Sequence, residues 1–308
     1  MDAPQVVVVG AAGMDTKGRA RGPLVPATSN PGDIRISVGG VGRNIAENLA
    51  RLGVNTFLLS VVGDDDSGRS ILECTRAGGV NVEHVLVQAK SRSAAYLAVL
   101  DEEGRLAISV DDMEIVKSIT SQYIYQRRRL IRDSDMVVMD ANLLTSTIRS
   151  LLKVARRYRV PVCADPTSTS LAMRLREHLP ELYMVTPNVA EAEVLCETGI
   201  SNRDEALQAA KKLVAMGVEV AIVTLAEMGV CYATTEVSGH VPAIRREIVD
   251  LTGAGDAMTA GIVFGLLNEF SIDEAVRLGV SAASLTLSCR ETVCPDLSLE
   301  KLYDQLVI

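Results

Sequence analysis

The 308-residue chain has no tryptophan, only three histidines, and six cysteines that form no C-x-x-C pair. His84, His178 and His240 are widely separated, and neither these residues nor the cysteines have the spacing of a zinc site. In a chain of this length, scattered cysteines are typical of reduced, mostly buried thiols in the cytoplasm. We therefore expect no structural metal and no disulfide framework.

The chain also lacks long apolar runs and an excess of basic residues. No run approaches the roughly 18 residues that a membrane helix needs. The start of the chain shows no signal-peptide pattern, so we expect a cytoplasmic protein without a membrane partner. With 31 basic and 39 acidic residues, its formal net charge is −8, which is not typical of a protein that binds a nucleic-acid polymer.

Two common nucleotide-binding motifs are missing. The strand predicted over residues 5–9 leads into Gly10-Ala11-Ala12-Gly13, which does not complete G-x-G-x-x-G. No Walker lysine motif occurs anywhere in the chain, which excludes a P-loop mechanism. Any phosphate must therefore be held by another kind of loop.

The second half of the chain alternates short apolar runs with helical patterns. The runs are 136–139, 162–164, 183–185 and 220–223, and an amphipathic helix is predicted over 145–157. This alternation predicts an α/β fold with a mostly parallel sheet covered by helices on both faces. Polar residues follow each strand, and parallel strands bind ligands at that edge. We expect residues 1–308 to form one domain.

Two other regions alternate apolar and polar residues, about 12–38 and 92–112. Alternation of this kind predicts strands with one solvated face, so these regions could pair into a small sheet that acts as a lid. Between them, Gly39-Gly40-Val41-Gly42-Arg43-Asn44 opens a predicted helix. The glycines allow a ligand to approach the backbone, or they merely turn the chain.

The stretch Asp250-Leu251-Thr252-Gly253-Ala254-Gly255-Asp256 reads as a polar loop that breaks into a helix. Free N–H groups at a helix start form a ready anion site, and phosphate is the usual guest. A carboxylate would repel phosphate, which indicates that Asp256 takes a proton from an attacking hydroxyl. The alternative is that Asp256 is the N-cap of the helix.

Two further segments are candidates for nucleotide and metal binding. Asn188 and Glu191 share a face at a helix start and could hold hydrated Mg²⁺, or they could form a capping box. The turn from Thr224 to Gly229 follows a predicted strand and could contact a nucleotide. Neither segment is specific by itself.

Taken in order, Asp15, Gly39-Gly40 with Asn44, Asn188-x-x-Glu191 and the 250–256 stretch resemble the ribokinase-like (PfkB) carbohydrate kinases over essentially the whole chain. Residues 29–32 and 39–50, Asp112-Met113 and residues 294–298 are similar to the branch of that family that phosphorylates pseudouridine. The resemblance implies a three-layer α/β/α core, a β-sheet lid and a kinase.

The resemblance also implies roles for the site residues. Asp256 would deprotonate a 5′-hydroxyl while the amides of Gly253, Ala254 and Gly255 stabilise the transferred phosphoryl group. The residues that would hold the ribose are Asp15, Gly39, Gly40, Asn44 and Asn142. Asn142 departs from the family pattern, because many members carry Glu there. On the lid, Asn30, Asp112 and Met113 would contact the base.

The implied cofactors are ATP, Mg²⁺ and a monovalent cation such as K⁺. The residues expected to contact the nucleotide are Asn188, Thr224, Gly229, Gly253 and Gly255. Glu191 would act on Mg²⁺ through water, and Asp250 and Thr252 are the first candidates for the monovalent cation. Lys17 and Arg43 could assist with charge, or could be surface cations.

The resemblance leaves three questions open. The substrate could be another nucleoside or a ribose-like sugar rather than pseudouridine. A sensing protein without catalysis is a further alternative, which the intact Asp256 and glycine loop oppose. A homodimer formed through the lid is also expected from the family.

Overall fold

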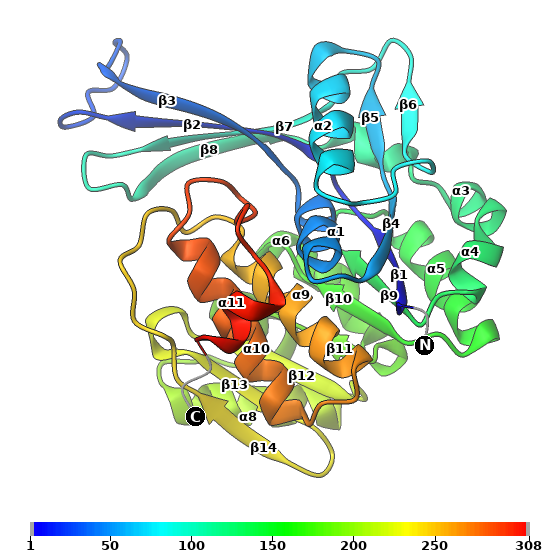
Figure 1. The fold of residues 1–308 in the computed structure, drawn as a ribbon. Coiled ribbons are helices and arrows are strands. Elements are labelled where there is room, and N and C mark those ends of the chain that lie inside the picture. The colour runs from blue at the N-terminus through cyan, green and yellow to red at the C-terminus, as the bar shows by residue number, and fades with distance from the viewer. Residues whose placement is uncertain (1–2, 306–308) are drawn as a thin grey trace.

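Eight strands form the central sheet of the computed structural model, which describes residues 3–305 (Figure 1). Their order is β14-β13-β12-β11-β10-β9-β1-β4. Neighbouring strands are parallel from β4 to β12, and β13 and β14 are antiparallel. The bounds are β1 Gln5–Val9, β4 Asn55–Leu59, β9 Met136–Asp140, β10 Val162–Asp165, β11 Met184–Val185, β12 Val220–Thr224, β13 Val230–Ala233 and β14 Ser238–Val241.

Successive residues of β1 point into two different cores, which explains its uninterrupted valines. Val6 and Val8 lie in one buried cluster, and Val7 and Val9 lie in the other. A strand with both faces covered by helices has no solvated side and carries no polar alternation. The parallel sheet with two helical layers predicted from the apolar runs is confirmed.

The helices divide between the two cores. The helices on the Val6 side are α1 Val41–Arg51, α9 Ala254–Leu267, α10 Ile272–Leu287 and α11 Leu299–Tyr303. The elements on the Val7 side are η1 Glu114–Ser118, α3 Ser121–Gln126, α4 Arg128–Arg132, α5 Thr145–Tyr158, α6 Thr169–Ala172, η2 Met173–Glu181, α7 Val189–Cys196 and α8 Arg203–Ala215. A short turn, η3 Ala226–Met228, follows β12.

A second, four-stranded sheet projects from the core at the upper left of Figure 1. Its order is β3-β2-β7-β8, with bounds β2 Gly13–Ala20, β3 Gly32–Gly39, β7 Ala94–Leu100 and β8 Leu106–Asp112. A third, small sheet pairs β5 Val61–Gly63 with β6 Leu86–Gln88 beside α2 Asp66–Ala77. The separate small sheet predicted for the lid is therefore present.

Strand register gives this second sheet two different faces. Thr16 pairs with Ile36 and Leu97, and Leu97 pairs with Val110, so these side chains share one face. We call this the outer face; its exposed apolar residues are Ile34, Ile36, Leu97, Ile108 and Val110. The inner face carries the row Ser37, Asp15, Tyr96 and Asp111, with Lys17 in the next row.

One expectation about the cysteines is wrong. Cys289 and Cys294 form a disulfide, because the loop after α10 brings their Cα atoms to 5.6 Å. The other four cysteines are free thiols, of which Cys163, Cys196 and Cys231 are buried. Within residues 3–305, every helix falls short of the length and apolar character that crossing a membrane requires.

Candidate active site

The first turns of α1 and α9 meet at a buried hydrogen bond between residues more than two hundred positions apart. The Asn44 Nδ2 atom donates to the Asp256 Oδ2 atom at 2.8 Å. Helix α9 begins at Ala254 with Gly253 as its N-cap, so Asp256 lies inside the first turn. The alternative that Asp256 is the N-cap is therefore wrong. Its carboxylate is aimed across the site at Asn44.

The environment of Asp256 suits a proton acceptor near neutral pH. Burial of the carboxyl, together with repulsion from Asp140 and Asp15, raises its pKa to about 7, although the hydrogen bond from Asn44 acts in the opposite direction. A general base works best when its pKa lies near the operating pH. The side chain that the sequence singled out thus has the electrostatics of a base.

Gly253 and Gly255, at the start of α9, differ in whether a side chain would fit. Gly253 adopts a φ of 82°, and a Cβ there would collide with the carbonyl of Thr292. At Gly255, a Cβ would meet no atom within 4 Å. Packing therefore requires glycine at 253 but not at 255. An empty space in front of a helix N-terminus leaves room for an anion.

Asp15 reaches the same region from the lid. It lies on the inner face of β2, is 8% exposed, and packs so closely on Gly39 that a Cβ there would collide with its carboxyl group. Burial raises the pKa of Asp15 to about 6, against the attraction of Lys17 and Arg43. Gly40 has a φ of 96° and packs on Ala11. The glycine pair thus turns the chain and also permits the close approach of Asp15.

Asp140, the last residue of β9, holds this part of the site together. Its Oδ2 atom accepts from the amides of Ala11 at 2.7 Å and Gly42 at 3.0 Å. Its Oδ1 atom accepts from the amide of Asn142 at 3.0 Å. Asp140 therefore fixes the end of β1, the start of α1 and the backbone of Asn142. Because this role depends on contacts across the chain, local sequence patterns carry no signal for it.

The carboxyl edge of the sheet is acidic. Asp165 ends β10, and its pKa lies well above the ordinary value because of burial and then of repulsion from Asp256 and Glu191. Burial also raises the pKa of Glu191. Within residues 3–305, no three histidine, cysteine or acidic side chains are grouped to bind a metal ion directly. An ion here would have to keep part of its water shell.

Asn188 and Glu191 form the capping box that was left open as an alternative. The Asn188 amide donates to the Glu191 carboxylate at 2.9 Å, and the Glu191 amide donates to the Asn188 Oδ1 atom at 3.0 Å. The backbone of Asn188 also forms an isolated parallel β-bridge with Thr224 at the end of β12. The amide of Leu225 donates to the carbonyl of Gly229 at 2.8 Å, closing the turn. The predicted nucleotide-contacting residues 188, 224 and 229 thus lie in neighbouring loops.

Lys17 and Arg43 are not surface cations. The Lys17 Nζ atom lies 2.9 Å from both Asp250 carboxylate oxygens and also donates to the Thr252 hydroxyl. Arg43 is 2% exposed, pairs with Glu47, and donates through Nη1 to the Asn44 Oδ1 atom at 3.0 Å. Lys17 thus joins the lid to the loop before α9, while Arg43 orients the amide of Asn44.

The three residues predicted to contact the base make other contacts in this structure. The Asn30 side chain bonds to the backbone of Val25 and Thr28 and shapes its own loop. Asp112 pairs with Ala95, which places it on the opposite face of the lid from Asp15, and Met113 packs against the Val7-side core. Tyr96 and Asp111 share the face of Asp15 instead. Strand alternation could have identified them, had the register been known.

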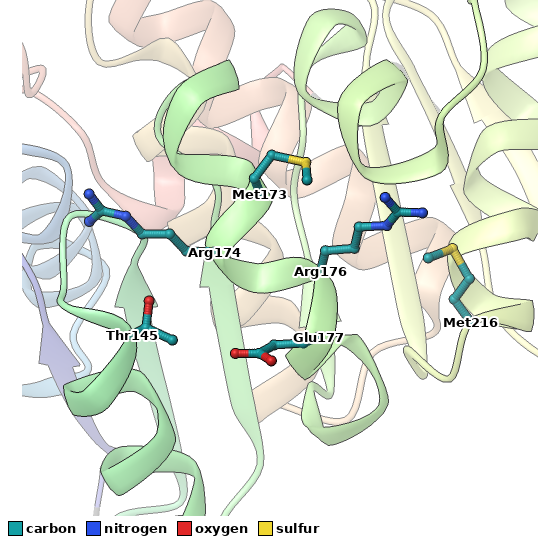
Figure 2. A pocket seen from close by; sticks show the side chains of 6 residues that line it. All are labelled: Thr145, Met173, Arg174, Arg176, Glu177 and Met216. Atoms are coloured by element: carbon teal, nitrogen blue, oxygen red, sulfur yellow. The ribbon is translucent and has the colours of Figure 1, made fainter.

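An open groove of about 640 Å³ lies elsewhere, along η2 (Figure 2). Its lining residues are Thr145, Met173, Arg174, Arg176, Glu177 and Met216. None of the residues assigned to the candidate site lines it. The Arg174 guanidinium donates to the carbonyls of residues 141–143, so it stabilises the loop after β9.

Known proteins are similar to this chain in sequence and in fold. The model of the pfkB family carbohydrate kinases matches residues 3–297. Pseudouridine kinase of Escherichia coli (strain K12) is 35% identical over 96% of this chain and 94% of its own. Guanosine-inosine kinase of Exiguobacterium acetylicum is 31% identical over 93% of this chain and 95% of its own. The structure of Arabidopsis thaliana ribokinase, described as complexed with ribose and ATP, superposes with a TM-score of 0.83, covers all of both chains, and is 21% identical.

The fold and the matched family define a phosphotransferase that acts on an alcohol group of a sugar or nucleoside. The chain belongs to the pfkB family of carbohydrate kinases, and its fold is ribokinase-like.

Proposed function

We propose that residues 1–308 form one kinase domain that transfers the γ-phosphoryl group of ATP to the 5′-hydroxyl of pseudouridine. The observation that carries the proposal is the buried hydrogen bond between Asn44 and Asp256 at 2.8 Å. Beside it, in the first turn of α9, a Cβ at Gly255 would meet no other atom, so there is room for a ligand. Asp256 accepts the hydroxyl proton, and the amides of residues 253–255 stabilise negative charge on the phosphoryl group. Because the donor is ATP, we place the enzyme in the cytoplasm.

The ribose is held from the lid and from the edge of the core. The Asp15 carboxylate accepts hydrogen bonds from the ribose hydroxyls, and the Asn44 side-chain amide donates to them. The backbone amides of Gly39 and Gly40 lie alongside. Asn142 reaches the same space from the end of β9. Asn44 thus contacts both the sugar and Asp256, so a bound ribose would be aligned with the base by one side chain.

ATP would lie over the loops that contain Asn188, Thr224 and Gly229, with its phosphates toward Gly253 and Gly255. Mg²⁺ would neutralise phosphate charge there, and Asn188 and Glu191 would hold it through water. The acidic surroundings of Asp165 and Glu191 support a cation at this edge. Replacing Glu191 by Gln tests this role. Gln can still accept the capping hydrogen bond from the backbone amide of Asn188, so we expect a higher Mg²⁺ concentration for half-maximal rate with little change in stability.

Pseudouridine differs from uridine by an additional ring N–H, so a selective site must present an acceptor to the base. Asp111 and Tyr96 lie in the inner-face row that contains Asp15. Two strand spacings separate Asp15 from Asp111, about 10 Å, which is comparable to the length of a nucleoside. We therefore assign base recognition to this row, in place of Asn30, Asp112 and Met113.

The substrate is tested by direct detection of nucleotide products with pseudouridine, uridine, guanosine, inosine and ribose. Guanosine, inosine and ribose are included because relatives named for them align with this chain. We expect kcat/KM for pseudouridine to exceed that for uridine by about tenfold or more. Equal values, or a preference for another compound, would overturn the substrate but not the kinase activity. Asp256→Asn serves as the inactive control.

We further propose a homodimer formed through the outer face of the lid. Ile34, Ile36, Leu97, Ile108 and Val110 are between 47% and 74% exposed and form adjacent cross-strand rows. A contiguous apolar patch of this kind is typical of an interaction surface, and a second copy would bury an identical patch. Sedimentation velocity of Ile36→Lys should show a monomer, whereas wild type should sediment as a dimer.

A further inference from the structure

The ammonium group of Lys17, on β2 of the lid, lies against the Asp250–Thr252 loop that precedes the phosphate-binding turn. The Lys17 ammonium lies 2.9 Å from the Oδ1 and Oδ2 atoms of Asp250 and also donates to the Thr252 hydroxyl. The side chains of Lys17 and Asp250 are 14% and 19% exposed, so water screens this pair only partly. Asp250 and Thr252 are the two residues that the family resemblance offered as first ligands of a monovalent metal ion.

The donor set does not fit a metal ion while Lys17 is in place. Both Asp250 oxygens face the ammonium, and Oδ1 also accepts from the amide of Thr252 at 2.9 Å. The single negative charge is thus matched by a single positive charge. A second cation at the same oxygens would be repelled by the first.

We propose that Lys17 is a built-in cation for the Asp250–Thr252 loop and takes the place of a monovalent metal ion. An ammonium group is a compact point charge, as such an ion is, but it is covalently attached and independent of the salt present. It holds the loop from which Gly253 and α9 follow, and it therefore acts on the phosphate-binding amides through their positions.

Because this cation is part of β2, its position is linked to that of Asp15 on the same strand. Asp15 and Lys17 are alternate residues of β2 and share its inner face. Any displacement of β2 moves the ribose-binding carboxylate and the ammonium together. The charge on the loop is therefore neutralised in the same arrangement of the lid that brings Asp15 to the substrate. A free metal ion would not provide this link.

The first test uses the wild-type protein without substrate. Melting temperatures are compared in KCl and in tetramethylammonium chloride at equal ionic strength, because the bulky ion cannot replace K⁺. We expect the two values to agree within about 1 °C. The turnover number, measured with the best substrate of the panel, should likewise change by less than about twofold across a K⁺ titration. A saturable rise in either quantity would overturn the proposal.

The second test removes the ammonium with Lys17→Met, which keeps a long unbranched side chain. In tetramethylammonium chloride we expect turnover to fall on the order of tenfold, and K⁺ to restore it saturably. K⁺ should also raise the melting temperature of this variant by about 2–4 °C. A folded variant that is insensitive to K⁺ in both measurements would contradict the proposal.

Arg19→Met is the matched control. Arg19 is the next residue of β2 on the same face, but its guanidinium donates to the carbonyl of Glu102 at the far end of the lid. It should show no K⁺ dependence. The melting measurements require no nucleoside, so failure of this inference and failure of the pseudouridine assignment are distinguishable.

Discussion

The two halves of the candidate site are built differently. On the core side, Asn44, Asp140 and Asp256 are each at least 91% buried, and each makes hydrogen bonds across elements distant in sequence. On the lid side, every residue of β8 is exposed, and Lys17 of β2 pairs with Asp250 of the loop before α9. Local stability increases with buried contacts and protected hydrogen bonds, so we expect the lid to have a lower free energy of local unfolding than the core. We infer that the core half fixes the chemistry and the lid half selects the substrate.

The largest effect should come from Asp256→Asn in the core half. An amide cannot accept the hydroxyl proton, and removal of a general base typically lowers kcat by 10²–10⁴-fold. The new side chain can still accept the hydrogen bond from Asn44, so we expect the fold and the nucleotide affinity to be retained. Calorimetric titration with ATP checks the latter. A kcat within about threefold of wild type would exclude Asp256 as the base.

Gly255→Ala should separate activity from stability. The added methyl group enters open space, and Ala is preferred over Gly in a helix by roughly 0.5–1 kcal/mol, so the melting temperature should rise or stay unchanged. Turnover should nevertheless fall by about 10²-fold, because the methyl group keeps the phosphoryl group from the amides. Gly253→Ala is the contrast: its Cβ would collide with Thr292, so that variant should lose stability as well. Unchanged turnover in Gly255→Ala would show that this space is not the anion site.

The pH profile reports the electrostatics of the same half. Asp256 acts when ionised and its pKa is about 7, so log kcat/KM should rise with pH by one unit per pH unit and level off above about 7. Below pH 6 the slope should steepen, because Asp15, with a pKa of about 6, also becomes protonated. A profile that is flat between pH 5 and 8 would contradict both assignments.

Stability should change with pH in the opposite direction. The folded state retains the Asp256 proton up to about pH 7, whereas the unfolded chain releases it near the ordinary value of 3.8. The unfolded state therefore binds fewer protons between these values, and the free energy of unfolding contributed by this group falls as pH rises. Thermal melts of wild type and Asp256→Asn across this range measure the difference.

Sequence patterns predicted the core half well because its signals are local. Apolar runs located β1, β9, β10 and β12, and the glycine loop located the start of α9 to within two residues. The Asn44–Asp256 contact and the role of Asp140 could not be predicted from spacing, since they arise from chain segments that meet only in the folded protein. The same holds for Lys17, whose partner lies at the other end of the chain.

The lid half was predicted less well for a different reason. Alternation located its strands, but alternation alone does not tell which of the two faces meets the site. Asp111 and Asp112 are neighbours in β8, and a shift of one residue along a strand reverses the face of the sheet on which the side chain lies. Asn30 shows a second limit: an Asn in a Pro-Gly-rich loop can bind a ligand or its own backbone, and here it binds the backbone.

The smallest effect, and the sharpest comparison within the lid, comes from the adjacent pair Asp111→Asn and Asp112→Asn. Both changes remove the same charge from exposed positions at the end of β8, so effects of net charge are matched. Asp111 shares the inner face with Asp15 and Tyr96, whereas Asp112 pairs with Ala95 and lies on the outer face.

If the Asp111 carboxylate accepts a hydrogen bond from the additional N–H of pseudouridine, its loss should reduce the ratio of kcat/KM for pseudouridine over uridine by about fivefold. That factor corresponds to one hydrogen bond of about 1 kcal/mol. Asp112→Asn should change that ratio by less than about twofold, and neither variant should alter kcat on ribose. A larger effect at Asp112 would show that the base lies on the other side of the sheet, and equal small effects would move base recognition from β8 to Tyr96 on β7.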